Sequence, residues 1–239
     1  MMDDIENLKE TLKHNIAAVQ ERIAEACQRV GRNPTEIKLV AVSKMVDVTR
    51  IETAYGLGLH DFGENWVQEA AAKIPQIEAP ATWHLIGHLQ TNKAKRAVEL
   101  FDVIQSVDSV RIAQAISTAA ASAGKEMPVL LEVNVSGEPT KYGFSPEDIS
   151  AAVDDIARLP AIRIQGLMTI AAIVGHPDEA RPYFAKLRQL RDNLRSTYPN
   201  IDWQHLSMGM TDDFEVAIEE GATIVRIGRA IFGERPHKD

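Results

Sequence analysis

The sequence predicts an α/β fold in which eight parallel strands close into one barrel, with a helix after each strand. Eight short apolar or β-branched segments alternate with helical segments along the chain. The 239 residues match the size of a single barrel of eight βα units. No glycine-rich dinucleotide fingerprint follows the first predicted strand, and no low-complexity linker divides the chain. A doubly wound open sheet is therefore the weaker alternative.

A long amphipathic helix is expected before the barrel. Apolar residues recur every three or four positions through residues 5–30, which places them on one stripe, and Pro34 follows its end. The chain has one cysteine, Cys27, on this stripe, so we interpret it as a buried packing residue and not as a nucleophile. We expect one domain, residues 1–239, made of a leading helix, 1–33, and a barrel, 36–233.

The predicted strands are short runs rich in apolar and β-branched residues. Capping signals mark helices between them, as where Ser145 fits the N-cap and Pro146 the first helical position. Right-handed crossovers through the helices make consecutive strands parallel. The eight strands are expected at residues 38–44, 59–63, 82–87, 102–107, 129–135, 162–168, 202–207 and 223–228.

The charge balance argues against a polyanionic partner. Lys and Arg number 26 against 34 Asp and Glu, a net charge of −8, so neither nucleic acid nor an anionic membrane is an expected partner. The basic run 93–96 is interpreted as a solvated helix start. The acidic N-terminus lacks the features of a signal peptide, and no apolar run is long enough to span a bilayer. We expect a cytoplasmic protein.

Functional residues of such a barrel lie at the carboxyl ends of its strands. Lys44 ends the first apolar run, so its amine is expected at the barrel mouth, where it can attack a carbonyl and form a Schiff base. The alternative is a lysine that reaches from a strand end into solvent. The same rule selects residues 63–65, His84, residues 87–88, Asn134, residues 168–169, residues 207–210, Arg226 and residues 228–229.

Two glycine turns follow the last two predicted strands. Residues 207–210, Ser-Met-Gly-Met, combine a hydroxyl with a turn whose N–H groups can approach an anion, and Gly228 precedes a short helix at 230–232. Loops after strands seven and eight, together with a short helix, form the phosphate site common in these barrels. An amine opposite a phosphate site indicates pyridoxal 5′-phosphate (PLP) or a phosphosugar lyase of the aldolase type. His84 and His88 lack neighbouring acids or cysteines in the sequence, so no metal is expected.

Several motifs resemble, in the same order, those of the YggS/PROSC family of PLP homeostasis proteins, which are related to the barrel domain of bacterial alanine racemase. They are VAVSKMV, FGENWVQE, WHLIGHLQTNK, GLMTI, LSMGM-TDDFEVAI and VRIGRAIFG, between residues 38 and 233. The resemblance implies a (β/α)8 TIM barrel of the fold type III class of PLP proteins. It also implies a carrier that buffers PLP and delivers it to apoenzymes.

The resemblance assigns roles to individual residues. Lys44 would hold PLP as an internal aldimine, and Arg226 would face the pyridine nitrogen. The resemblance also implies that the phosphate contacts Ser207, Met208, Gly209, Gly228 and Arg229. The ring would contact Asn65, His84 and Met168.

A racemase and an aldolase are the alternative functions. A guanidinium stays protonated, so Arg226 cannot stabilise a protonated pyridine nitrogen as a carboxylate does, and the cofactor should be a weaker electron sink than in a transaminase. The alternative is that Arg226 pairs with a carboxylate inside the barrel. A racemase needs a second base, and among the 4 tyrosines only Tyr142, in a loop with Lys141, could serve. An aldolase would need a strand-borne acid beside Lys44. We expect a non-catalytic carrier and, without a second domain, a monomer.

Overall fold

Within residues 2–234, the part of the chain that this computed structural model describes, eight parallel strands close into a barrel in the order β1 to β8. β1 pairs with both β2 and β8, which closes the ring. The predicted (β/α)8 barrel is therefore confirmed; Met1 and residues 235–239, at the ends of the predicted domain, lie outside the described residues. The strands are β1 (Lys38–Val42), β2 (Asp61–Glu64), β3 (Thr82–Leu85), β4 (Val103–Val107), β5 (Met127–Glu132), β6 (Ile162–Met168), β7 (His205–Ser207) and β8 (Ile224–Ile227).

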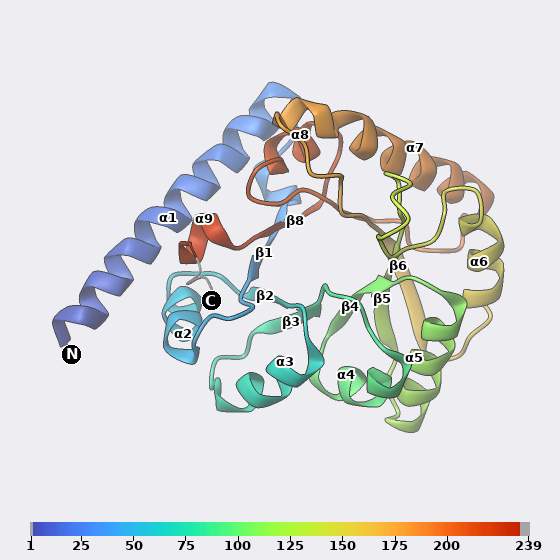
Figure 1. The fold of residues 1–239 in the computed structure, drawn as a ribbon, viewed down its shortest axis with the longest axis horizontal. Helices are drawn as coiled ribbons and strands as arrows, with labels where there is room; N and C mark the ends of the chain where they lie inside the picture. The colour runs from blue at the N-terminus through green and yellow to red at the C-terminus, as the bar shows by residue number, and fades with distance from the viewer. Residues whose placement is uncertain (1, 235–239) are drawn as a thin grey trace.

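Helices surround the strands and follow one another around the ring (Figure 1). Side-chain caps set some of their starts, as where the Asp47 carboxylate accepts the Arg50 N–H at 2.9 Å. The Ser145 hydroxyl accepts the Asp148 N–H at 3.1 Å, but this bond closes a turn, and the helix begins at Ile149, later than predicted. The helices are α1 (Met2–Arg29), α2 (Val48–Gly56), α3 (Val67–Lys73), α4 (Ala94–Leu100), α5 (Val110–Ser122), α6 (Ile149–Ile156), α7 (Arg181–Thr197), α8 (Phe214–Glu219) and α9 (Arg229–Phe232).

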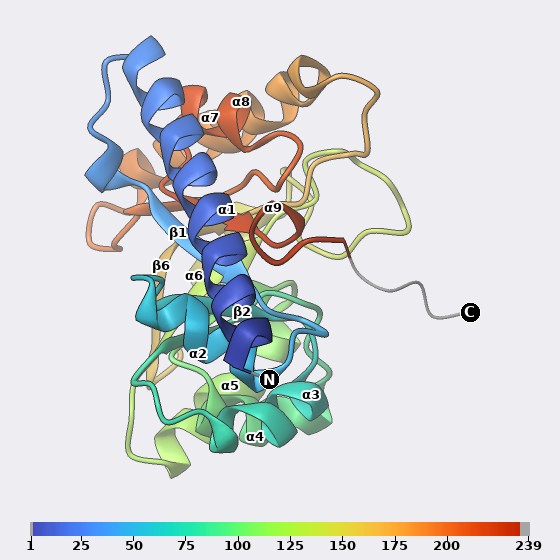
Figure 2. The same ribbon diagram turned by 90° about the vertical axis from the view of Figure 1, so that its left-hand side faces the viewer.

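The leading helix α1 lies along the outside of the barrel, across β1 and beside α8 and α9 (Figure 2). Its apolar stripe is buried from Leu12 to Cys27, whereas Ile5 and Val30 at its two ends are exposed. Cys27 has no exposed surface, which confirms the packing interpretation of this residue. Polar contacts hold the same face. Arg22 forms a two-pronged ion pair with Glu215 of α8, at 2.8 and 2.9 Å. The helix thus covers the seam between β1 and β8.

The apolar core has two parts, because strand residues alternate between the two faces of the barrel wall. The larger part fills the space between strands and helices. The smaller part, inside the barrel, consists of Val40, Leu130, Met168 and Ile224. The residues that share the interior face with these four are largely polar. They include Asp61, His84, Gln105, Ser207 and Arg226.

Candidate functional site

The parallel strands bring the predicted site residues to one end of the barrel. Lys44 lies two residues beyond the end of β1, in a turn, and is half-buried. Ser207 is the last residue of β7, and Gly228 follows β8 directly. Since carboxyl ends of parallel strands meet at the same edge, the amine-bearing turn and the two glycine turns surround one mouth.

Hydrogen bonds from side chains of α3 to the main chain hold the turn that carries Lys44. The Lys73 ammonium of α3 donates to the Ser43 carbonyl at 2.8 Å, and the Glu69 carboxylate accepts the Met45 N–H at 2.5 Å. The peptide groups on both sides of Lys44 are therefore held. Met45 has a φ of 61°, a left-handed conformation that is uncommon for a residue with a side chain. α3 thus positions the lysine turn.

Glu64, at the end of β2, completes this cluster. Its Oε1 accepts from Lys73 at 2.8 Å and from the Ser43 hydroxyl at 2.7 Å, while its Oε2 is buried and has no hydrogen-bond partner among the residues that the structure describes. Burial raises the pKa of the Glu64 carboxyl, and the bond from Lys73 opposes that rise. Glu64 lies at a strand end, as would the acid that an aldolase needs beside Lys44. Its Oε1, however, already accepts hydrogen bonds from Lys73 and Ser43.

The turn after β7 depends on Gly209, which has a φ of 91°. A Cβ there would lie 2.6 Å from the Cβ of Ala217 and 2.8 Å from the Cα of Phe214, so only glycine fits against α8. The Gly209 carbonyl accepts the Arg226 N–H at 3.0 Å, which joins this turn to β8. Met208 is fully buried in the core between barrel and helices. The Met208 N–H donates to the Ile224 carbonyl at 3.1 Å, so both its side chain and its N–H are engaged within the protein.

The turn after β8 leads directly into α9, with Gly228 at the N-cap. The Arg229 guanidinium forms an ion pair with Asp212 of the preceding turn, and a longer one, at 3.7 Å, with Glu234. This side chain therefore links the two glycine turns to each other. The first N–H groups of a helix have no partner within the helix, which leaves main-chain donors for an anion at this point.

Arg226 points into the barrel and is buried, with 4 % of its surface exposed. Its Nη1 donates to the Ser207 hydroxyl at 2.6 Å and its Nη2 to the Thr169 carbonyl at 2.9 Å. These partners are neutral, so Arg226 does not make the close carboxylate pair considered from the sequence. Burial lowers its pKa to about 10, against the more distant charges of Glu132 and Asp213, and the guanidinium remains protonated at neutral pH.

Glu132 is a buried residue of the mouth that sequence reasoning missed. It ends β5 on the interior face, two residues beyond Leu130, and only 6 % of its surface is exposed. Burial raises its pKa to about 7, the charge of Asp108 adds to the rise, and Arg226 opposes it. In the sequence, Glu132 is an acid in the otherwise apolar run of residues 129–133, and this is the signal that could have identified it.

The three predicted ring contacts lie at different depths. Met168 is buried in the inner apolar cluster and pairs with Ser207 in the sheet register. Asn65 follows β2 at the mouth, where its main chain packs so closely on Gly87 that a Cβ at Gly87 would collide with the Asn65 carbonyl. His84 lies inside the barrel with both ring nitrogens hydrogen-bonded to protein side chains.

The loop after β5 carries the remaining candidates. The Lys141 ammonium donates to the Ala171 carbonyl at 2.8 Å and pairs with Glu138 at 2.7 Å, so it is held at the loop base. The Tyr142 ring stacks on His88 at 3.7 Å between ring centroids, and 56 % of its surface is exposed. Stacking thus holds Tyr142, the candidate second base of a racemase, against His88.

Neither a metal cluster nor a membrane span is found among the described residues. Among the side chains of residues 5–234, no three from His, Cys, Asp or Glu gather in a way that could hold a metal ion. Within the same residues, no helix has the length and apolar character needed to cross a bilayer.

The fold and the sequence define a barrel of the alanine racemase type. Residues 10–236 match the family described as alanine racemase, N-terminal domain. Alanine racemase of Clostridium difficile 630, in its complex with cycloserine, superposes with a TM-score of 0.74 at 17 % identity, covering 96 % of this chain and 61 % of that one. At this identity the likeness concerns the fold.

Sequence relatives define the family more narrowly. The chain is 45 % identical over 223 residues to a pyridoxal phosphate homeostasis protein of Aquifex aeolicus, covering 93 % of this chain and 97 % of that protein. PipY of Synechococcus elongatus PCC7942, solved with PLP bound, superposes with a TM-score of 0.79 at 38 % identity, over 88 % of this chain and all of that one. The chain belongs to the family of pyridoxal phosphate homeostasis proteins.

Proposed function

We propose that this protein binds PLP at the barrel mouth, holds it as a Schiff base on Lys44 and releases it to apoenzymes. The turns at Ser207–Gly209 and at Gly228 and Arg229 bind the phosphate, and Arg226 faces the pyridine nitrogen. The ring lies among the residues Asn65, His84 and Met168. PLP itself supplies an aldehyde that condenses with amines and a ring that withdraws electrons.

One observation carries the proposal: a buried guanidinium with neutral partners lies at the same mouth as Lys44. Arg226 keeps its positive charge while its hydrogen bonds go to Ser207 and Thr169. A buried charge without a close counter-ion is costly, and a phosphorylated pyridine supplies the missing negative charge and an acceptor nitrogen. The available donors therefore fit PLP.

The same residue argues against chemistry that needs a strong electron sink, as in a transaminase. A protonated guanidinium cannot stabilise a protonated pyridine nitrogen, so the bound ring is a weak electron sink. The stacking of Tyr142 on His88 also disfavours it as the second base that racemisation needs. We place the protein in the cytoplasm as a monomer, with neither nucleic acid nor membrane as partner.

Delivery to apoenzymes is supported by an apolar rim, which we define as the exposed large apolar residues in loops that follow the strands. Apolar residues gathered on one face mark contact surfaces, and these loops all lie at the carboxyl end of the barrel. The Trp66 side chain, just after β2, is 50 % exposed. The rim comprises Met45, Trp66, Tyr142, Ile170, Ile173 and Met210.

A transfer experiment tests delivery. The loaded protein is mixed with an excess of a PLP-free aminotransferase, and the recovery of aminotransferase activity is compared with recovery from free PLP. We expect recovery to depend on the carrier concentration, and Trp66→Ser to slow it several-fold. Ile5→Ser, which changes an equally exposed residue of α1, serves as the control and should transfer at the wild-type rate. If recovery follows only the release of free PLP and Trp66→Ser has no effect, the delivery role is wrong.

A further inference from the structure

A chain of hydrogen bonds crosses the interior of the barrel. At the amino-terminal end, Lys38 of β1 donates to the Oδ1 of Asp61 at 2.9 Å, and the same oxygen lies 2.8 Å from the Nε2 of His84. The Nδ1 of His84 lies 3.0 Å from the side-chain nitrogen of Gln105 on β4. The first half of the chain thus steps from β1 to β4 along neighbouring strands.

The second half crosses the barrel to the mouth. The Ser207 hydroxyl lies 2.6 Å from the Gln105 Oε1 and 2.6 Å from the Arg226 Nη1, and Arg226 also donates to the Thr169 carbonyl. Gln105 and Ser207 have no exposed surface, and His84 has 2 %. The middle of the chain is therefore shielded from water.

Chemistry fixes the direction of these bonds. A guanidinium can only donate, so the Ser207 oxygen accepts from Arg226. The Ser207 hydroxyl donates to the Gln105 carbonyl, and with this orientation of the amide its NH2 group faces the Nδ1 of His84, which accepts. The ring hydrogen of His84 then lies on Nε2 and is donated to Asp61. The order of these bonds thus corresponds to the Nε2–H form of His84.

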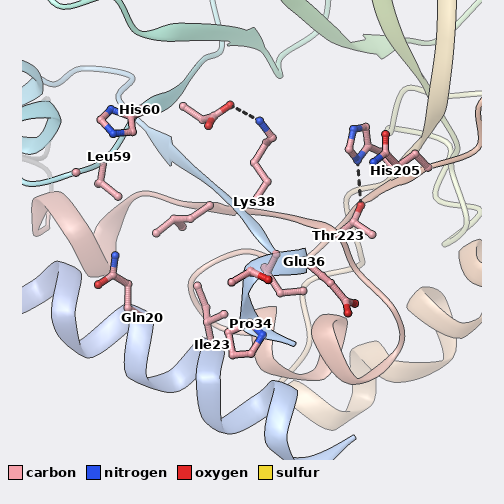
Figure 3. A pocket seen from close by; sticks show the side chains of 15 residues that line it. Gln20, Ile23, Pro34, Glu36, Lys38, Leu59, His60, His205 and Thr223 are labelled. Carbon is pink, nitrogen blue, oxygen red and sulfur yellow. Dashed lines mark hydrogen bonds and ion pairs between the residues drawn. The ribbon is translucent and has the colours of Figure 1, made fainter. Parts of the chain in front are cut away.

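Water reaches the chain at its amino-terminal end. A pocket of about 580 Å³ opens there between α1 and the start of β1, with the Lys38–Asp61 ion pair in its wall (Figure 3). Lys38 is 39 % exposed and Asp61 18 %. The charged and titratable groups near His84 are Asp61 and, further away, Lys38 and His205. Solvent thus contacts the chain at the end opposite to the mouth.

We propose that Gln105 is a positioning residue, which transmits the hydrogen-bond order at His84 to Ser207 and thereby holds the Arg226 guanidinium in place. The inference rests on the proposed function, in which Arg226 faces the PLP ring. Without the Gln105 carbonyl, the Ser207 hydrogen has no fixed direction, and its oxygen is no longer oriented as the acceptor for Arg226. His84 acts one step further away and sets which end of the Gln105 amide faces Ser207.

The first experiment needs no cofactor. In Gln105→Glu, one carboxylate oxygen still accepts from Ser207, while the other faces the Nδ1 of His84, which must now carry a hydrogen. Nitrogen-15 spectra of the histidine rings at about pH 7.5 should show a neutral Nε2–H ring for His84 in the wild type and a doubly protonated ring in the variant. Gln114→Glu, an exposed change on α5, should leave the His84 signal unaltered. A wild-type ring with hydrogen on Nδ1, or one unchanged by Gln105→Glu, overturns the hydrogen-bond order.

The second experiment measures the effect at the mouth. Gln105→Leu should weaken PLP binding about tenfold and shift the visible absorption of the bound cofactor, since Arg226 loses its oriented acceptor. Gln105→Glu should keep a PLP affinity close to that of the wild type, because Ser207 still has an acceptor, whereas the added charge on His84 can move the absorption band. If both variants weaken PLP binding equally, or neither does, Gln105 only fills space. If Gln105→Leu fails to fold, Gln105→Met takes its place. Failure of Lys44 to take up PLP would refute the proposed function but leave the ring spectra as a test of the chain.

Discussion

The variant Glu132→Gln should change how the stability of the cofactor-free protein depends on pH. Burial raises the pKa of Glu132 from 4.5 to about 7, so the folded chain holds this proton more tightly than the unfolded chain. Protonation of Glu132 therefore favours folding. Its stabilising contribution is complete below about pH 4.5 and is lost as the pH rises through about 7.

The size of the effect follows from the pKa difference. The pKa difference, at about 1.36 kcal/mol per unit, corresponds to about 3 kcal/mol in the free energy of unfolding. Most of this loss, about 2–3 kcal/mol, falls between pH 5 and pH 8, where the folded and unfolded chains differ in bound protons. The amide introduced by Glu132→Gln cannot titrate, so the stability of the variant lacks this pH-dependent loss. A change in stability that is equal at both pH values, from the missing attraction to Arg226, does not affect the comparison.

Urea unfolding at pH 5 and pH 8 measures the difference. Between these pH values the wild type should lose about 2–3 kcal/mol more than Glu132→Gln. The exposed change Glu147→Gln is the matched control and should keep the wild-type pH dependence. If the wild type and Glu132→Gln lose the same stability over this range, the carboxyl is not buried as described and the reasoning fails.

Two further predictions concern the lysine turn and the assembly. Lys73→Met should cost about 3–5 kcal/mol of stability at pH 8, because it leaves the buried Glu64 charge unpaired, and less at pH 5, where Glu64 can take up a proton. Urea unfolding at both pH values checks this, with the exposed Lys9→Met as control, and a loss under about 1 kcal/mol at pH 8 would contradict it. Light scattering at micromolar concentration should give the mass of one 26.4 kDa chain, and a stable dimer would refute the monomer.

Strand and helix alternation was enough to predict the barrel, but the strand ends were less exact. The second and seventh strands were expected from residues 59 and 202, whereas β2 begins at Asp61 and β7 at His205. Apolar residues before a strand are buried without pairing in the sheet, as Trp203 is. Burial therefore extends further along the sequence than main-chain pairing, and an apolar run overestimates strand length.

The buried polar residues are harder to find from the sequence. Gln105 lies in a segment whose sequence is typical of an ordinary strand, and its hydrogen-bond partner Ser207 is 102 positions away. Only closure of the barrel brings the two strands opposite each other. Lys73 likewise sits among helical residues, and nothing local shows that its ammonium reaches the carbonyl of Ser43. The strand-end rule finds residues at the mouth but not those that support them.

The most direct test of the central claim identifies the lysine that takes up PLP. The purified protein is loaded with PLP, reduced with borohydride, digested and analysed by peptide mass spectrometry. We predict a yellow protein whose reduced adduct lies on the peptide containing Lys44, and a Lys44→Ala variant that is colourless but keeps the wild-type circular dichroism spectrum. An adduct found solely on another lysine, such as Lys141, would contradict the account.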